Sequence, residues 1–376
     1  MKRSILFTMI LVFVFGLPIN CIAGEEIRIG VMTTLTGEAA YIGEYAQDGA
    51  NMAVKEINDN GGINGSLVKL YYEDETTTTA SINAYRKLRE RKVHAIVGSI
   101  YSVKVAAVLP EVQKFGGPPI VVGATSPKIW SKETENDWVF GDRASDELVT
   151  KLAVKFAVEE LNADKVGIIY INDDFGRDGL EAMKALFETR NMEPAAITSC
   201  VEGDKDFTAQ IRLFKQVGCE VIIPWVHPLE GGLFVRQLHQ LGMDVDIVGP
   251  SHFVSVQTME IMGKDADEGL YSVTDFVASS EEPKVAEWVA EYIKLYDREP
   301  ALFSVFAYDA VNILAAAIEK AGTADPEDIR DALLEIEVEG IIGTFKANPE
   351  TLNGLHQVRI AQIQNGKPVV LQTIKE

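Results

Sequence analysis

Short apolar runs alternate with longer amphipathic runs along almost the whole chain. The first apolar run, Ile27 to Met32, predicts a buried strand. Tyr45 to Asn58 follows with apolar residues at helical spacing and a stop at Gly61–Gly62. The pattern then predicts strand 67–72, helix 80–91, strand 93–98, helix 103–115 and strand 120–123. Strands that alternate with helices of this length are typical of parallel sheets covered on both faces.

A second set of alternating elements begins after Arg143. It comprises helix 145–161, strand 166–170, helix 179–190, strand 195–201, helix 207–217, strand 221–225, helix 231–241 and strand 247–248. A chain of 376 residues is long enough for two domains. The predicted fold class is therefore α/β, with two doubly wound parallel-sheet lobes.

Residues 1–23 have the pattern of a secretory signal peptide. Lys2–Arg3 supplies positive charge, Ile5 to Phe15 is apolar, and Cys21 to Ala23 resembles a small-residue cleavage site. Asn20 stands where a lipoprotein signal has a small residue, so we expect no lipid anchor at Cys21. We therefore expect a periplasmic protein without a membrane anchor after cleavage.

Charge and cysteine usage narrow the picture further. The formal net charge of -21 disfavours nucleic acid and anionic membranes as partners, because both repel an acidic surface. Cys200 ends one predicted strand and Cys219 begins the next, so the two thiols should lie at opposite edges of a parallel sheet. A disulfide needs Cα atoms within about 7 Å, so we predict two free, buried cysteines.

Small hydroxyl residues follow two apolar strands at a glycine. The segment after Gly98 leads to Tyr101 and Ser102, and the second reads Gly123-Ala124-Thr125-Ser126-Pro127. Ligands of open α/β sheets bind where strands end and helices begin, and helix N-termini favour anions. With no Lys or Arg among these residues, the two strand ends predict a neutral cradle for a small carboxylate. The glycine-containing segment 34–43 adds a third strand-end loop.

Signatures of catalysis are missing from the sequence. It has no G-x-S-x-G, P-loop or H-E-x-x-H pattern, and its histidines do not have metal-ligand spacing. We therefore expect no enzyme, no cofactor and no metal site. His227 and His252 each follow a strand end, so both could face a cleft, although a surface or hydrogen-bonded structural role is favoured for each. The segment Asn172 to Arg177 predicts a polar loop, in which Phe175 is equally compatible with an ordinary turn or a cleft wall.

The order of these motifs resembles the leucine/isoleucine/valine-binding proteins, which are type I periplasmic solute receptors of ABC importers. The resemblance covers essentially the whole chain after the signal peptide. Each match alone is weak, but the matches together and in order are specific. It is carried by the segment 27–65 with Gly61-Gly62-Ile63-Asn64-Gly65, by Val97-Gly98, Gly123 to Pro127, Lys205-Asp206-Phe207, Gly249-Pro250, Tyr308-Asp309-Ala310 and Ile342-Gly343.

The resemblance implies two lobes joined by three hinge crossovers, near residues 141–144, 273–276 and 343–347. One lobe would comprise residues 24–143 and 275–342, and the other residues 144–274 and 343–376. A ligand would bind between the lobes, which would close on it by hinge bending. The implied partners are a small-molecule carboxylate and an inner-membrane ABC permease, and we expect the receptor to be a monomer.

The resemblance also implies a set of ligand-binding residues. Ser102, Gly123 and Thr125 fall on the carboxylate positions of the family, and Tyr41 or Ile42 falls in its side-chain pocket. Phe175 falls on the aromatic wall of the second lobe and Phe303 near the rim. The whole predicted site is Tyr41, Ile42, Tyr101, Ser102, Gly123, Ala124, Thr125, Phe175, Trp225, Val226, His227, Ser251 and Phe303.

The sequence departs from the family where amino-acid receptors hold the α-ammonium. Those positions fall on Val226 and Ser251, neither of which carries negative charge, although a buried cation needs a partner. Either another acid takes this role, or the ligand lacks an ammonium group. The candidate acids are Asp173, Asp174, Glu230 and Asp275. Residues near the departing positions that suit an aromatic or other apolar carboxylate are Trp225, His227, Phe253 and Phe276.

The expected function is thus a receptor for a small carboxylate, with a hydrophobic amino acid favoured by the resemblance. A receptor for an aromatic or aliphatic carboxylate, or an amide- or urea-type sensor on the same fold, is the alternative binding function. An exported hydrolase or racemase is the enzymatic alternative, but it would need an acid/base pair that the spacing does not provide.

Overall fold

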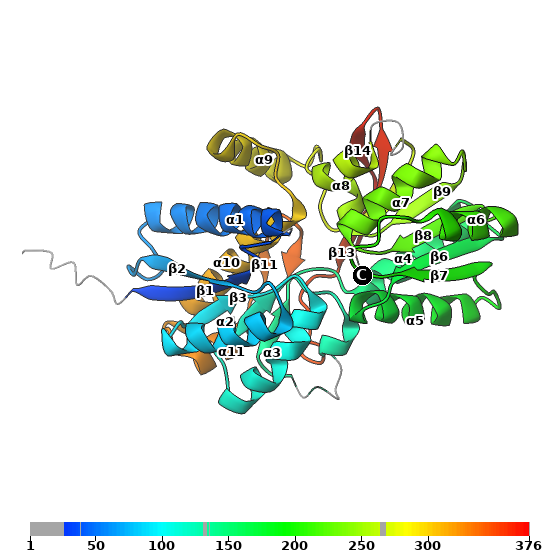
Figure 1. Ribbon diagram of the computed structural model, residues 1–376. Coiled ribbons are helices and arrows are strands. Elements are labelled where there is room, and N and C mark those ends of the chain that lie inside the picture. Colours follow the sequence, from blue (N-terminus) through cyan, green and yellow to red (C-terminus); the bar gives the residue numbers. More distant parts are fainter. Residues whose placement is uncertain (1–25, 38, 131–133, 135, 264–267, 376) are drawn as a thin grey trace, which may run out of the picture.

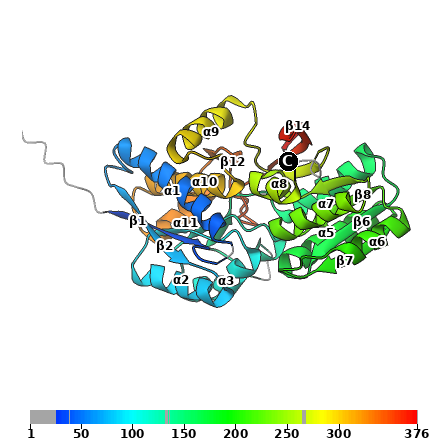
Figure 2. The same ribbon diagram turned by 45° about the horizontal axis from the view of Figure 1, so that its top comes forward.

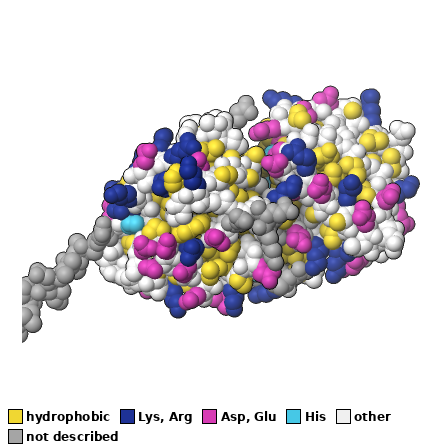
Figure 3. Space-filling view, turned by 90° about the horizontal axis from the view of Figure 1, so that it is seen from below, with side chains coloured by type: hydrophobic (Ala, Val, Ile, Leu, Met, Phe, Trp, Pro, Cys, Tyr) yellow, Lys and Arg dark blue, Asp and Glu magenta, His cyan; other side chains and the backbone are white. Residues whose placement is uncertain are grey.

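Two separate β-sheets organise the chain into two α/β lobes that lie side by side (Figures 1 and 2). The structure is a computed structural model and describes residues 26–37, 39–130, 134, 136–263 and 268–375, so the predicted signal peptide lies outside it. On the face shown in Figure 3, acidic and basic side chains are interspersed over both lobes.

The first sheet is entirely parallel, as its alternating pattern predicts. Its strand order is β2-β1-β3-β4-β5, and the strands are β1 (Ile27–Thr33), β2 (Val68–Asp74), β3 (Ala95–Val97), β4 (Ile120–Val122) and β5 (Val139–Gly141). Its helices are α1 (Ala40–Asp59), α2 (Thr78–Glu90) and α3 (Ser102–Phe115), and three later helices complete this lobe: α9 (Pro283–Tyr296), α10 (Leu302–Ala321) and α11 (Pro326–Glu335).

The second sheet is parallel except at one edge. Its order is β14-β13-β10-β9-β8-β6-β7, with β6 (Val166–Ile171), β7 (Ala196–Cys200), β8 (Val221–Trp225), β9 (Asp246–Gly249), β10 (Tyr271–Thr274), β13 (Gln357–Gln364) and β14 (Lys367–Lys375). The antiparallel β13–β14 hairpin corrects the expectation of purely parallel sheets. Asn365 and Gly366 both have positive φ, the conformation that two-residue hairpin turns require.

Helices cover both faces of the second sheet. They are α4 (Asp146–Lys155), which continues as a π-helical turn (Phe156–Glu160), α5 (Asp174–Glu188), α6 (Thr208–Val217), α7 (Pro228–Gln240) and α8 (Val256–Met262), with a 3-10 turn at Ser251–Val254. Helix α5 begins at Asp174 rather than at residue 179, because Asp173 caps it by accepting a hydrogen bond from Gly176 N at 2.9 Å. The predicted polar loop 172–177 is therefore mainly a helix start.

The three segments that cross between the lobes are bonded to one another. The Arg143 side chain forms a two-pronged ion pair with Asp275, at 2.7 Å from Nε to Oδ2 and 3.3 Å from Nη2 to Oδ1. Arg359 Nη1 donates to the carbonyl oxygens of Asp275 at 2.7 Å and Ile342 at 3.0 Å. We propose lobe boundaries at 143/144, 274/275 and 342/343, because these bonds join all three crossovers at those positions.

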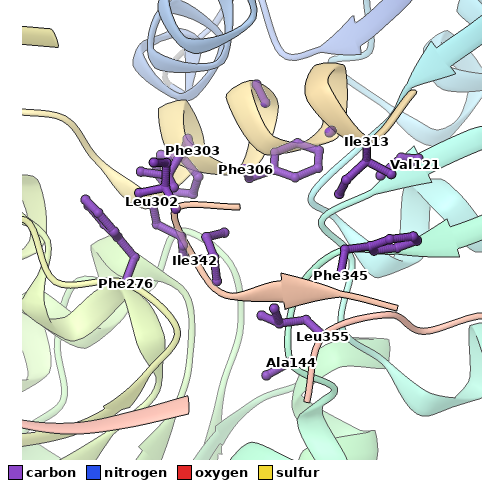
Figure 4. Close-up of a cluster of buried hydrophobic side chains, with 14 of the residues drawn as sticks. Val121, Ala144, Phe276, Leu302, Phe303, Phe306, Ile313, Ile342, Phe345 and Leu355 are labelled. Atoms are coloured by element: carbon purple, nitrogen blue, oxygen red, sulfur yellow. The ribbon is translucent and has the colours of Figure 1, made fainter. Parts of the chain in front are cut away.

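Apolar side chains surround this crossover region (Figure 4). They come from the start of α10, from the third crossover and from the ends of both sheets, and include Val121, Ala144, Phe276, Leu302, Phe303, Phe306, Ile342, Phe345 and Leu355. All of them belong to a single buried cluster that runs from the first lobe into the second. The packing at the hinge is therefore continuous with the cores of both lobes.

Helix α10 is apolar because it is a core helix. By length and composition it is apolar enough to cross a membrane, with a mean hydropathy of 1.5, but 78% of that stretch is buried inside the protein. It packs against α1 at Gly49, where an added Cβ would lie 1.8 Å from the carbonyl oxygen of Ser304. This contact explains why α1 carries a glycine in its interior despite the cost to helix propensity.

Cys200 and Cys219 are both free and buried, which confirms the prediction from their positions in the βαβ unit. Cys200 is the last residue of β7, and Cys219 precedes β8. Burial raises the pKa of the Cys200 thiol to about 12. Both side chains therefore act as small apolar residues in the core of the second lobe.

Substituting Gly49→Ala tests the close contact between α1 and α10. The added methyl group must push the Ser304 backbone away, so we expect the free energy of unfolding to fall by about 1–3 kcal/mol in urea denaturation. Gln47→Ala, two residues earlier on the same helix, should change it by less than about 0.5 kcal/mol. Equal stability of the two variants would contradict the packing described here.

Candidate functional site: a cavity between the lobes

A cavity of about 80 Å³ lies between the two lobes, at the ends of strands from both sheets. From the first lobe and the first crossover it is lined by Ile42, Ile100, Tyr101, Ser102, Thr125 and Arg143, among others. From the second lobe and the start of α10 it is lined by Asp146, Asp173, Phe175, Trp225, His227, Ser251, His252, Leu302 and Phe303, among others. Nine of the thirteen predicted site residues are in these walls.

Helix starts converge on the cavity. Ser102 is the first residue of α3 and Asp146 the first of α4, while Phe175, Pro228 and Leu302 stand in the first turns of α5, α7 and α10. The unpaired N–H groups and the dipole of a helix N-terminus favour negative charge. The wall can therefore stabilise an anion without a free cationic side chain.

The hydroxyl groups of Ser102 and Thr125 have opposite hydrogen-bonding roles. Ser102 Oγ accepts a hydrogen bond from Ser126 N at 3.2 Å, so its own O–H remains available to donate. The Thr125 hydroxyl is hydrogen-bonded to the Asp146 carboxyl group, and it donates whenever that group is ionised, so its oxygen lone pairs remain available to accept. The cavity therefore offers a donor and an acceptor on adjacent strand-end segments.

Asp146 is a buried acid in the cavity wall that the sequence analysis missed. Burial raises the pKa of its carboxyl group to about 7, although the hydrogen bond from Thr125 and the charge of Arg143 oppose the shift. Its Oδ2 is enclosed and has no hydrogen-bond partner among the described residues. Ser145 caps α4, accepting a hydrogen bond from Leu148 N at 3.3 Å, and thereby fixes the acid at the start of the helix. The capping serine marks a helix start in the sequence but does not reveal that the acid after it is buried.

Aromatic rings form the wall on the second lobe. Phe175 is stacked against Trp225, with ring centroids 5.3 Å apart, and against His227, with ring centroids 5.4 Å apart. Tyr101 of the first lobe meets the His227 ring edge-on at 6.1 Å. Of the two interpretations of Phe175, the cleft wall is therefore the one that the structure supports.

Asp173 holds His227 in this stack. Its Oδ2 lies 2.7 Å from His227 Nε2, while its Oδ1 accepts the capping hydrogen bond from Gly176 N. Burial opposes ionisation, but the bonds from His227 and Gly176 outweigh it and lower the pKa of Asp173. Both oxygens of this acid are therefore engaged within the second lobe.

Four predicted site residues do not reach the cavity wall. Val226 is fully buried in the core of the second lobe, because adjacent residues of an extended segment point to opposite sides and His227 takes the cavity side. Ala124 is likewise buried in the core of the first lobe. Gly123 packs beside Phe306, and its carbonyl oxygen accepts from Arg143 Nη1 at 3.3 Å. Tyr41 packs edge-on against Phe303, which is itself a lining residue.

Of the four candidate acids for an ammonium group, only Asp173 lines the cavity. Asp174 is paired with Arg177 on the surface, Glu230 accepts from Gly203 N at 2.8 Å, and Asp275 is paired with Arg143. The two phenylalanines expected nearby are also absent from the cavity lining. Phe253 packs on Gly249, and Phe276 lies among the apolar side chains that surround the crossover region.

Arg143 corrects the expectation that no cation is near the strand ends. It lines the cavity and bonds to Gly123, but its charge is balanced by Asp275. In the sequence Arg143 stands out only as the boundary of the first lobe, because its partner in the ion pair is 132 residues away along the chain. His252 also lines the cavity, so of its two interpretations the cleft-facing one agrees with the structure.

Direct contacts join the rims of the two lobes. Ser126 Oγ donates to Asp178 Oδ2 on α5 at 2.5 Å, and Lys128 forms an ion pair with the same carboxylate. On another side Gln257 Nε2 donates to the Tyr45 hydroxyl at 2.6 Å. These bonds hold the lobes together around the cavity in the arrangement described here.

Comparisons with known proteins agree on one family. The sequence profile described as "Periplasmic binding protein" matches residues 26–368. The leucine-, isoleucine-, valine-, threonine- and alanine-binding protein of Pseudomonas aeruginosa is 29% identical over 321 residues, which cover 85% of this chain and 84% of that protein.

Solved structures show the same fold. The branched-chain amino acid transporter substrate-binding protein LivJ of Streptococcus pneumoniae, in complex with isoleucine, superposes with a TM-score of 0.85 at 26% identity, covering 94% of this chain and 100% of LivJ. A solute-binding protein of R. palustris in complex with benzoate superposes with a TM-score of 0.82 at 17% identity, covering 94% of this chain and 98% of that one.

Replacing Asp146 by Asn tests its raised pKa. The unfolded chain releases this proton near pH 4 and the folded protein near pH 7, so the folded state holds the proton over that interval and its stability falls as the pH rises. Asn does not titrate. When the pH is raised from 5 to 8, the free energy of unfolding of the ligand-free Asp146→Asn variant should therefore rise by roughly 2–3 kcal/mol relative to that of the unsubstituted protein. Urea unfolding at the two pH values measures this change.

The comparison is internally controlled, because the other buried acids are present in both proteins. Burial also raises the pKa of Glu75 to about 7 and that of Asp309 to about 6, and their effects cancel in the difference. A stability difference that is the same at both pH values would contradict the raised pKa of Asp146.

Proposed function

This chain belongs to the periplasmic binding protein family, and we propose that its ligand is an α-amino acid with an apolar side chain. Members of the family are solute-binding receptors that work with ABC permeases and are not enzymes. Of the proteins named above, those of Pseudomonas aeruginosa and Streptococcus pneumoniae are amino-acid receptors according to their names, whereas the R. palustris protein is in complex with benzoate. The identity of this chain's ligand rests on its own cavity.

The observation that carries the proposal is the opposite polarity of Ser102 and Thr125. The free O–H of Ser102 suits a carboxylate oxygen, and the lone pairs of Thr125 suit an ammonium N–H. An α-amino acid carries these two groups on one carbon atom, so neighbouring donor and acceptor sites match it. A simple carboxylate would leave the acceptor side without a donor.

Charge balance supports the same ligand. The converging helix N-termini favour the carboxylate, and the buried Asp146 carboxyl group, beside Thr125, favours the ammonium. A nearby ammonium would stabilise the ionised form of Asp146 and offset the cost of burying its charge. The Arg143–Asp275 pair adds no net charge.

The side-chain end of the cavity is apolar. Ile42 and Phe303 face it from one side, and the Phe175–Trp225 stack from the other. These walls are suited to an aliphatic or aromatic side chain. We further propose that the lobes open and close about the three crossovers, that the receptor acts as a monomer in the periplasm, and that residues 1–23 are its cleaved signal.

One feature favours a second candidate, an aromatic carboxylate without an ammonium group. The Phe175 ring is stacked against both Trp225 and His227, and such an aromatic wall also suits a planar ligand. This candidate leaves Asp146 without a partner, so we rank it second. The ligand pairs below separate the two.

Matched ligand pairs test for the ammonium group. We expect L-leucine or L-phenylalanine to bind at least about tenfold more tightly than 4-methylpentanoate or 3-phenylpropanoate, respectively, because the deaminated analogues lose a charge-assisted hydrogen bond. Isothermal titration calorimetry on the purified protein measures both members of each pair. Equal or tighter binding of the deaminated acids would overturn the amino-acid proposal and favour the second candidate.

Removing both hydroxyls tests the cradle itself. Ser102→Ala combined with Thr125→Ala should weaken binding of the preferred amino acid by roughly 2–4 kcal/mol, because two hydrogen bonds to charged groups are lost. Thr189→Ala, on the exposed end of α5, provides a control and should leave the affinity unchanged. Unaltered affinity of the double variant in calorimetry would rule out this assignment.

A further inference from the structure

His252 is a cavity residue whose ring has one enclosed nitrogen without a partner. It belongs to the 3-10 turn that follows β9, and it lines the cavity next to Ser251. Its Nε2 is shielded from solvent and has no hydrogen-bond partner among the described residues. A buried nitrogen in this state carries a cost that a ligand can remove.

The ring is neutral and its proton can be placed. Burial, with contributions from His227 and Arg143, lowers the pKa of His252 to about 3, so it carries one ring proton at neutral pH. The ring also has a hydrogen bond to the backbone of Val226, which favours its protonated form, so the ring is the donor. Because Nε2 has no partner, the proton lies on Nδ1. Nε2 therefore carries an unused lone pair on a residue that lines the cavity.

The count of donors and acceptors points to the ligand group that meets this lone pair. An ammonium group has three N–H donors, and the Thr125 oxygen provides one acceptor on the first lobe. Among the described cavity residues, the enclosed polar atoms without a partner are Asp146 Oδ2, His252 Nε2 and Trp225 Nε1. The first two are acceptors, whereas the indole N–H is a donor and faces Gly179.

Two other polar side chains of the second-lobe wall have hydrogen-bond partners. Ser251 Oγ donates to the carbonyl oxygen of Val273 at 3.4 Å, and the Asp173 oxygens accept hydrogen bonds from His227 and Gly176. His252 Nε2 and Asp146 Oδ2 are thus the enclosed acceptors of the second lobe that line the cavity without a hydrogen-bond partner among the residues described.

We propose that His252 determines specificity by accepting, through its neutral Nε2, a hydrogen bond from the α-ammonium group of the ligand. The inference rests on the proposed amino-acid function and adds a neutral acceptor of the second lobe to the acid Asp146. The ligand's positive charge is then balanced by Asp146, while the neutral His252 ring accepts a hydrogen bond that orients the ammonium group. Because Thr125 and His252 stand on different lobes, one ammonium group bonded to both would link the lobes.

A cycle of ligands and variants tests the inference. The probes are L-leucine with 4-methylpentanoate and L-phenylalanine with 3-phenylpropanoate, measured by calorimetry on the unsubstituted protein and on His252→Phe. The phenyl ring keeps the shape and removes the acceptor. We expect His252→Phe to weaken binding of the preferred amino acid about tenfold or more. The affinity of its deaminated partner should change less than about twofold.

Two further variants keep the result interpretable. His252→Gln retains an acceptor and should recover part of the preference for the amino acid, which a purely structural role of the ring would not produce. His239→Phe, at an exposed position on α7, is the matched control and should leave both affinities unchanged. Thermal unfolding verifies that each variant is folded.

The outcomes separate this inference from the proposed function. If the unsubstituted protein prefers the amino acid and His252→Phe weakens both members of the pair equally, the role of His252 is wrong while the amino-acid function stands. If a folded His252→Phe keeps the full preference, the inference is also overturned. If the unsubstituted protein shows no preference, or binds no member of either pair, the proposed function fails and the inference fails with it.

Discussion

The buried ion pair between Arg143 and Asp275 is the interaction on which the architecture of the cavity depends. Two opposite charges are stable in the interior only when each is held by the other and by further hydrogen bonds. Here the carbonyl oxygen of Gly123 accepts a further hydrogen bond from Arg143, and Arg359 donates to the backbone carbonyl oxygens of Asp275 and Ile342. The pair joins the first crossover to the second, and Arg359 adds the third. Since Arg143 also lines the cavity, the hinge and the cavity wall share a residue.

The alternation of strands and helices was predictable from the sequence up to about residue 250, because buried parallel strands leave continuous apolar runs. The antiparallel β13–β14 edge was not predicted, although its Asn365–Gly366 turn is a recognisable hairpin signal. The start of α5 was placed late for a similar reason, since the capping role of Asp173 was interpreted as loop chemistry. Signals carried by only one or two residues were overlooked, whereas long periodic runs were recognised.

The cavity residues that directly follow a strand could be predicted from the sequence. Those whose position depends on contacts with distant segments could not. Ser102, Thr125 and Phe175 follow strands directly, and the structure brings all three to one cavity. Val226 does not line the cavity, although it was expected to, because a shift of one residue along an extended segment reverses the direction of a side chain. Asp146 and His252 depend on burial by segments distant in sequence, and no local pattern reveals that an acid or a histidine is enclosed.

Helix α10 has a consequence for the unfolded chain as well as for the folded protein. A segment this apolar competes for the lipid phase whenever the chain passes a membrane before folding. Asp309 stands within it and, in the folded protein, accepts hydrogen bonds from the backbone N–H groups of Ile341 and Ile342. An aspartate near the centre of a candidate span adds about 2.5–3.5 kcal/mol to the cost of insertion. The carboxylate that anchors the third crossover thus also discourages the core helix from entering the bilayer.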